Sequence, residues 1–278
     1  MNHLPVLRSL FYLGGTVSFL ISSTCDYGAI AQSEAEFDPS GSPGRPSGPI
    51  VPGGANTDDD DFDFAAELRV YSPPSDLKNP REDHTGGGVL GCGDEVAAIA
   101  PRLNSIGRTA SSNPTFVWYN FSDDGDPIEF QLYRYEDDGS FEIVDIEQYD
   151  TSQRGFMAYT LPPEVDELEV GEVYLWQVVL YCDREFNEPG QYTSAEIEVV
   201  ELPADLATGL PEDAVDKGRA YAGAGLWYDA FAEVYDAETP EAEALRQDLL
   251  LDLADLEAQL DEPAIVDLSE QLREIADL

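Results

Sequence analysis

Residues 128–132 read Ile128-Glu129-Phe130-Gln131-Leu132, and this stretch decides the fold class. Its apolar and polar side chains alternate, and the same alternation returns in residues 195–199, Ala-Glu-Ile-Glu-Val. A period of two places one face of a β-strand in a core and leaves the other face in water. Both stretches therefore predict strands with one buried face.

Short segments of the same kind fill the chain from residue 66 to residue 201. The other predicted strands cover residues 68–71, 115–119, 141–146, 156–161 and 173–182. Turn-forming residues separate most of them, such as Asp137-Asp138-Gly139-Ser140 between two strands. About seven strands without helices between the central ones are typical of an antiparallel β-sandwich. We therefore predict a β-sandwich domain over residues 65–202, of the immunoglobulin or fibronectin kind.

A turn leads into the most apolar of these segments, where Gly171 stands shortly before Tyr174 and Trp176. Immunoglobulin-like sandwiches often place a tyrosine at the corner that enters a core strand, where its hydroxyl bonds to upstream backbone. Trp176 and Trp118 are then expected to point inward as core aromatics. A platform for a ligand is the alternative role for both tryptophans.

The pattern changes to helices after Pro203, so we expect a protein that is mainly β with α-helices at its carboxyl end. Small and aromatic residues there have nearly the spacing of one tetratricopeptide-like helical hairpin: Gly218, Tyr221, Trp227, Ala230 and Ala237. Thr239 and Pro240 predict a further helix start, because they fit a cap and a first-turn proline. Two apolar stripes follow, formed by Leu249, Leu253, Leu256 and Leu260 and by Ile265, Leu268, Leu272 and Ile275. Residues 203–278 are thus predicted to form a helical hairpin region that packs on the sandwich, with a partner-binding groove as the alternative.

The first residues predict export. Arg8 precedes an apolar stretch, Leu10 to Ile21, and the triplet Ala29-Ile30-Ala31 follows it. This is the layout of a cleavable signal peptide over residues 1–31, with lipidation at Cys25 as the alternative. Residues 32–64 are rich in Gly, Pro, Ser and Asp and predict a disordered acidic linker. No later segment is long and apolar enough to span a bilayer, so we expect a periplasmic or extracellular protein.

The chain is strongly acidic, with 57 acidic and 14 basic residues and a formal net charge of -43. Such a field repels nucleic acid and anionic lipid surfaces, so neither is an expected partner. The acidic residues are spread along the whole chain and are not confined to one tail. This distribution favours adaptation to a saline or brackish habitat. A further hypothesis is that this acidic surface binds cations.

Cysteine and histidine are too scarce to predict a metal site or a nucleophilic centre. After cleavage the cysteines are Cys92 and Cys182, which predict one disulfide in an oxidising compartment. His84 is the one histidine of the mature chain and has no zinc-type partners. Residues 86–91 match G-x-G-x-x-G but follow no predicted strand, so we expect a glycine-rich loop and no cofactor. The acidic residues are too numerous to single out a catalytic carboxylate pair, and the catalytic residues are unknown.

Four separated stretches resemble the cyanobacterial family called "domain of unknown function 928". They are residues 86–92, the segment Asn113-Pro114-Thr115-Phe116-Val117-Trp118-Tyr119, residues 168–183 with Gly171, Tyr174 and Trp176, and Gly225-Leu226-Trp227-Tyr228-Asp229-Ala230. The resemblance covers roughly residues 86–260 and implies a cyanobacterial origin and a periplasmic or cell-surface location. It supplies no catalytic residues.

These observations favour a non-enzymatic binding or assembly module of the cell envelope, with an envelope protein or a polysaccharide as partner. The alternative is a carboxylate-dependent envelope hydrolase that acts on polysaccharide. A pair of Asp or Glu residues buried together in a cleft between sandwich and helices would favour the hydrolase, because a shared low-dielectric site raises one pKa.

Overall fold

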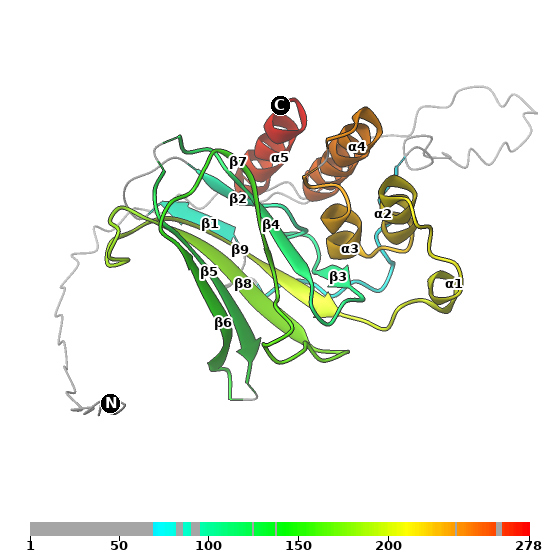
Figure 1. The fold of residues 1–278 in the computed structure, drawn as a ribbon, viewed down its shortest axis with the longest axis horizontal. Helices are drawn as coiled ribbons and strands as arrows, with labels where there is room; N and C mark the ends of the chain where they lie inside the picture. Colours follow the sequence, from blue (N-terminus) through cyan, green and yellow to red (C-terminus); the bar gives the residue numbers. More distant parts are fainter. Residues whose placement is uncertain are drawn as a thin grey trace, which may run out of the picture. The chain divides into compact units, whose positions relative to one another are not determined.

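The computed structural model in Figure 1 describes residues 69–81, 86–89, 95–123, 125–136, 138–236, 238–259 and 263–278, with the backbone alone for 86–89 and 263–267. The predicted signal peptide and linker lie outside these residues, as do His84 and Cys92. The fold of the described residues is mainly β, and its helices follow the strands in sequence.

The larger of two sheets has six strands in the order β1-β9-β8-β5-β6, with β3 beside β9. Their bounds are β1 Gly86–Val89, β3 Gly107–Thr109, β5 Ile128–Tyr135, β6 Phe141–Tyr149, β8 Val173–Tyr181 and β9 Pro189–Val199. The pairs along this path are antiparallel, whereas β3 and β9 are parallel. The prediction of a purely antiparallel arrangement is therefore wrong for this sheet, which is mixed.

The smaller sheet has three antiparallel strands in the order β2-β4-β7. They are β2 Val96–Ala98, β4 Thr115–Asn120 and β7 Gly155–Thr160. The aromatic side chains of the two sheets contact each other. The ring of Phe130 in β5 lies 5.0 Å from Phe116 and 6.2 Å from Trp118 in β4, and 4.5 Å from Tyr159 in β7. The alternating stretch at 128–132 thus turns its apolar face to the other sheet.

Two sequence predictions about the first strands are wrong. Residues 69–71 form no strand, because the backbone N–H groups of Val70 and Tyr71 donate to the carboxylate of Asp252 at 2.7 and 2.9 Å. Residues 86–89 are not the glycine-rich loop that the sequence predicts but form β1, which pairs with β9 through backbone groups that need no side chains.

Five helices follow residue 203 in the described chain: α1 Ala204–Ala207, α2 Ala214–Gly223, α3 Trp227–Ala232, α4 Pro240–Glu257 and α5 Pro263–Ala276. The predicted helix start is confirmed, since Pro240 begins α4 and the Thr239 side chain accepts a hydrogen bond from the Ala242 N–H. The hairpin expected over 218–237 is not established, because its second helix, α3, has only six residues. No described helix is long and apolar enough to cross a membrane.

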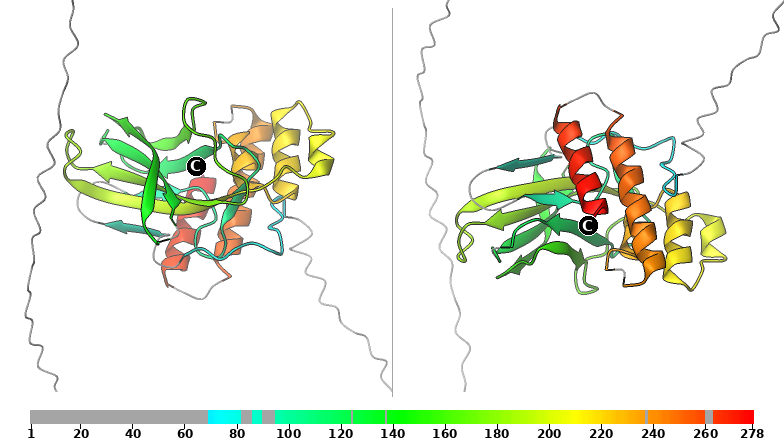
Figure 2. Two further views of the ribbon diagram at one scale, coloured as in Figure 1. Left: turned by 90° about the horizontal axis from the view of Figure 1, so that it is seen from below. Right: turned by 90° about the horizontal axis from the view of Figure 1, so that it is seen from above.

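Helices α2 to α5 gather on one side of the sheets (Figure 2). Helix α3 is fixed to both sheets by buried hydrogen bonds from its aromatic side chains. The Trp227 indole donates to the carbonyl of Ile99 beside β2 at 2.9 Å, and the Tyr228 hydroxyl donates to the carbonyl of Glu196 in β9 at 2.9 Å. Helices and sheets therefore share one hydrophobic core.

Candidate functional site

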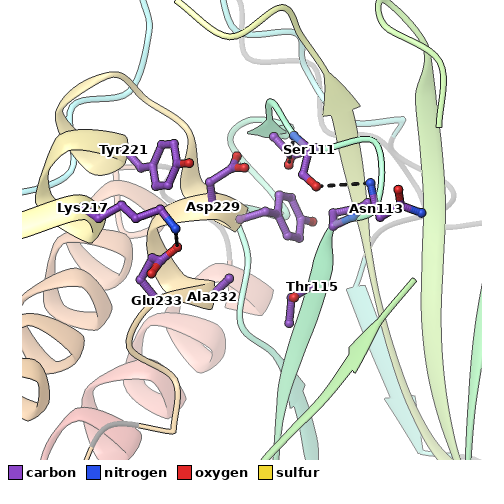
Figure 3. Close-up of a pocket in the computed structure, with 11 residues that line it drawn as sticks. Ser111, Asn113, Thr115, Lys217, Tyr221, Asp229, Ala232 and Glu233 are labelled. Atoms are coloured by element: carbon purple, nitrogen blue, oxygen red, sulfur yellow. Dashed lines mark hydrogen bonds and ion pairs between the residues drawn. The ribbon is translucent and has the colours of Figure 1, made fainter. Parts of the chain in front are cut away.

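A pocket of about 220 Å³ lies between the segment 109–115 and helices α2 and α3 (Figure 3). Its lining is mostly polar and consists of Thr109, Ser111, Asn113, Pro114, Thr115, Lys217, Tyr221, Tyr228, Asp229, Ala232 and Glu233. In Figure 3, Ser111, Asn113 and Thr115 lie on one side, and Lys217, Tyr221 and Glu233 lie on the other.

Local hydrogen bonds shape the wall that connects β3 to β4. The Ser111 N–H donates to the Thr109 hydroxyl at 3.0 Å, and the Asn113 N–H donates to the Ser111 hydroxyl at 3.2 Å. Short hydroxyl side chains favour such turns over regular structure, because they bond to backbone groups two residues away. The segment therefore leaves the sheet and places its hydroxyl and amide groups along the pocket.

The helical wall depends on close packing of α2 and α3. A Cβ atom on Gly218 would lie 3.2 Å from Leu245 in α4 and 3.4 Å from the carbonyl of Ala230, so the glycine lets α2 approach both helices. Gly225 makes the turn between α2 and α3 with a φ of +75°, and a Cβ there would collide with Pro74. The spacing within α2 then puts Lys217 and Tyr221 on one face.

Lys217 and Glu233 form an ion pair across the pocket wall, with 2.5 Å between Nζ and Oε1. The hydrogen bond to Glu233 raises the pKa of Lys217. The Lys217 ammonium also lies 5.8 Å from the ring centre of Tyr221. Both charged side chains keep some contact with solvent, so the pair leaves donors of Lys217 available to a ligand.

Asp229 ties the two walls together. Its carboxylate accepts a hydrogen bond from the Ala110 N–H at 2.9 Å. Burial raises the pKa of Asp229 to about 6, although hydrogen bonds from the Ala110 N–H and the Thr109 side chain act in the opposite direction. The negative charge of Glu233, one helical turn further on, adds to the rise. Asp229 thus changes its protonation near pH 6 while it holds the segment 109–115 to α3.

Asn113 carries an unpaired donor beside the pocket. Its side-chain nitrogen is buried and has no hydrogen-bond partner among the described residues. Its side-chain oxygen accepts from the Ser112 hydroxyl at 3.3 Å, which fixes the amide. Buried polar groups are normally bonded to protein, ordered water or a ligand. This nitrogen has almost no accessible surface, so a ligand in the pocket does not contact it in this arrangement.

A model of the family described as Domain of Unknown Function (DUF928) matches residues 89–264, about the range over which the sequence resemblance extends. The chain belongs to this family. Two of the stretches that carry the resemblance to the DUF928 family meet at the pocket, since Asn113, Pro114 and Thr115 lie in one and Tyr228 and Asp229 in the other.

Other comparisons add no argument about the site of this DUF928 protein. No curated protein matches the chain. A solved structure titled "Structural and functional analysis of a lytic polysaccharide monooxygenase important for efficient utilization of chitin in Cellvibrio japonicus" is similar at 9% sequence identity and a TM-score of 0.25. The match covers 39% of this chain and 58% of that chain, which is less than two thirds of its length.

The aromatic residues singled out from sequence lie in the core of the DUF928 protein. Trp118, Tyr174, Trp176 and Trp227 are fully buried, and none of them lines the pocket. The Tyr174 hydroxyl accepts a hydrogen bond from the Glu169 N–H at 3.0 Å, and Gly171 between them has a φ of +93°. This is the corner geometry that the sequence suggested.

One of the two cysteines of the predicted disulfide, Cys182, lies in the described part of the chain. Cys182 directly follows β8, and its N–H donates to the carbonyl of Glu188 at 2.8 Å. Cys92 lies outside the described residues, so the bridge between them stays a prediction.

In the part of the chain that the structure describes, no three His, Cys, Asp or Glu residues come together in a way that could hold a metal ion.

Sequence reasoning missed Lys217, Asp229 and Glu233 as site residues. Signals in the sequence could have found two of these three residues. Lys217 is one of two lysines in the whole chain, and Asp229 lies inside a stretch that carries the family resemblance. Neither signal says that Asn113 and Asp229 share a pocket, because that requires the contact between α3 and the β3–β4 segment.

Proposed function

We propose that this member of the DUF928 family is an exported cell-envelope protein that works as a binding module on an immunoglobulin/fibronectin-like sandwich. Export is supported by the layout of residues 1–31. The sandwich assignment is supported by two facing sheets, by the order β1-β9-β8-β5-β6 against β2-β4-β7, and by the Tyr174 corner at the start of β8.

The ligand that fits the pocket best is a small uncharged molecule rich in hydroxyl groups, such as one sugar unit of an envelope polysaccharide. The observation that carries this proposal is the Lys217–Glu233 ion pair in the pocket wall, which keeps contact with solvent and leaves donors of Lys217 available. A hydroxyl group can accept from Lys217 and at the same time donate to Glu233 or Asp229. A second hydroxyl of the same ligand can bond to the Ser111 hydroxyl on the opposite wall, so a hydroxyl-bearing ligand reaches both walls.

Charge and size narrow the ligand class. Lys217 balances one of the two carboxylates, so the pocket is neutral when Asp229 is protonated and carries one negative charge when it is ionised. An anionic sugar is therefore disfavoured. A volume of about 220 Å³ holds on the order of seven waters at about 30 Å³ each, which suits one sugar ring better than a chain of them.

The second candidate is a polysaccharide hydrolase that uses the same pocket. Asp229 and Glu233 both line it, and the raised pKa of Asp229 suits a general acid. Both carboxylates already have partners, however: Asp229 holds the Ala110 N–H and Glu233 holds Lys217. Because both carboxylates are engaged in these bonds, the arrangement favours binding over hydrolysis.

Titration calorimetry on the mature protein tests the ligand class. We expect saturable binding of neutral methyl glycosides, with glucuronate much weaker at pH 7.5. Lys217→Met is expected to weaken binding by about tenfold, the cost of one lost hydrogen bond. Lys78→Met is the matched control, because Lys78 is also paired with a glutamate, Glu198, and does not line the pocket. Equal binding of neutral and anionic sugars, or no binding, would overturn the proposal.

Release of reducing ends from a neutral polysaccharide separates the two candidates. The binding proposal predicts no release by the wild-type protein. Release that is abolished by Asp229→Asn but retained by Lys78→Met would favour the hydrolase.

A further inference from the structure

Strand β6 carries an unusual share of the exposed apolar surface. Five large apolar side chains of the described chain are exposed, and three of them lie on β6: Phe141 at 40%, Ile143 at 58% and Ile146 at 39%. Single exposed apolar residues need no explanation, but a contiguous group marks an interaction surface.

The strand register puts these three side chains on one face of the sheet. Phe141 pairs with Tyr135, Ile143 with Tyr133 and Ile146 with Gln131 in β5. These β5 residues alternate with Phe130 and Leu132, which point to the other sheet and are fully buried. The strip formed by Phe141, Ile143 and Ile146 therefore lies on the outer face. The register shift between Leu132 and Tyr133 leaves Val144 without an opposite residue in β5. Ile146 therefore lies on the same face as Phe141 and Ile143, although it is three residues from Ile143.

Strand β6 is also the edge of its sheet. Among the described residues it pairs with no strand but β5, so its other side is open to an added strand, although the Ile146 N–H already donates to the Asp145 carboxylate at 2.9 Å. Edges of this length readily accept an added strand unless charge or shape prevents it. Main-chain hydrogen bonds would then supply affinity, and the apolar strip would supply pockets for alternate side chains.

Charge decides which strand can be added. Residues 141–149 contain Glu142, Asp145 and Glu147 and no basic residue. A second copy of this chain would bring the same acidic strand and a net charge of -43 against it. The chain's own segment 32–64 contains the run Asp58 to Asp61 and is repelled in the same way. In a segment that alternates basic and apolar residues, the basic side chains would pair with the acidic side chains of β6, and the apolar side chains would pack on the strip.

We propose that β6 is a docking edge that adds an extended segment of a partner protein in which Lys or Arg alternates with apolar residues. This inference is independent of the sugar-binding pocket, because β6 lines no part of that pocket.

Two synthetic peptides of the length of β6 test the proposal on the full mature chain. One alternates Lys with Val, and the other alternates Glu with Val. We expect the Lys peptide to bind, to weaken as salt is raised, and to protect the backbone amides of β6 from hydrogen exchange. The Glu peptide is expected not to bind.

A pair of variants separates the strip from general apolar exposure. Ile143→Asn is expected to weaken binding of the Lys peptide on the order of tenfold. Val170→Asn is the control, because Val170 has the same exposure of 58% and lies in the turn before β8. No binding of the Lys peptide, binding without protection of β6, equal effects of the two variants, or a dimer that protects β6 in sedimentation and exchange experiments would each overturn the proposal.

Discussion

The indole nitrogen of Trp176 donates a buried hydrogen bond of 2.7 Å to the hydroxyl of Tyr228, which joins β8 to helix α3. The same hydroxyl donates to the carbonyl of Glu196 in β9 at 2.9 Å. Tyr228 also lines the pocket, so the core of the protein fixes one pocket wall directly.

Tyr228→Phe is therefore expected to destabilise the whole fold. It leaves the Trp176 nitrogen and the Glu196 carbonyl buried without their partner, at a cost of about 1–3 kcal/mol for each unsatisfied group. Urea unfolding followed by tryptophan fluorescence measures the free energy of unfolding. Tyr192→Phe is the control, because Tyr192 lies on the outer face of the large sheet. Equal stability of the two variants would contradict a structural role for the Tyr228 hydroxyl.

Asp229 should make stability depend on pH. Its pKa in the folded protein is about 6, against an ordinary value of 3.8, so the folded state holds this proton more tightly than the unfolded chain. Its contribution is therefore complete below about pH 4 and is lost as the pH rises through about 6. The difference in unfolding free energy between wild type and Asp229→Asn isolates this effect from other carboxylates. We expect this difference to move in favour of the Asp229→Asn variant between pH 4 and pH 7. A difference that stays flat would show that Asp229 titrates normally.

Salt should stabilise the protein. Its net charge of -43 brings many carboxylates within a Debye length, which is about 8 Å at physiological ionic strength and about 3 Å at 1 M. Repulsion is stronger in the compact state, so screening favours folding. We expect the thermal midpoint to rise between low salt and about 1 M sodium chloride. A flat or falling midpoint would indicate carboxylates already neutralised by bound cations.

The predicted bridge between Cys92 and Cys182 closes a loop of about ninety residues, which the chain-entropy model values at roughly 4 kcal/mol before strain. Alkylation of non-reduced, denatured protein followed by mass spectrometry checks it. We expect no alkylated thiol at either position. Two alkylated thiols would disprove the bridge.

Sequence patterns located the parts of the fold that depend on local periodicity. The alternation at 128–132 predicts the apolar face of β5, and Thr239 with Pro240 predicts the start of α4. The parallel pairing of β3 with β9 left no such signal, because three residues carry too little pattern and the register depends on distant backbone. The segment 69–71 looked like a strand but bonds to Asp252 of α4 instead.

Local sequence patterns could not predict the pocket either, because its walls come from segments far apart in the chain. Asn113 and Asp229 come from segments far apart in the sequence, and they share a pocket only because α3 is bonded to the sheets. With so many carboxylates in the chain, only its place in the stretch 225–230 that carries the family resemblance set Asp229 apart from solvated acidic residues. Its partner, the Ala110 N–H, is a backbone group that any residue could supply.

The most direct test of the sugar-binding proposal is the nuclear magnetic resonance signal of the Lys217 side chain, beside its ammonium group, during titration with a neutral methyl glycoside. We predict that its shifts move and saturate as the ammonium gains an acceptor, while the signals of Lys78, the other lysine of the chain, stay unchanged. Saturable binding of the glycoside that leaves the Lys217 signals unmoved, or no binding, would contradict the proposal.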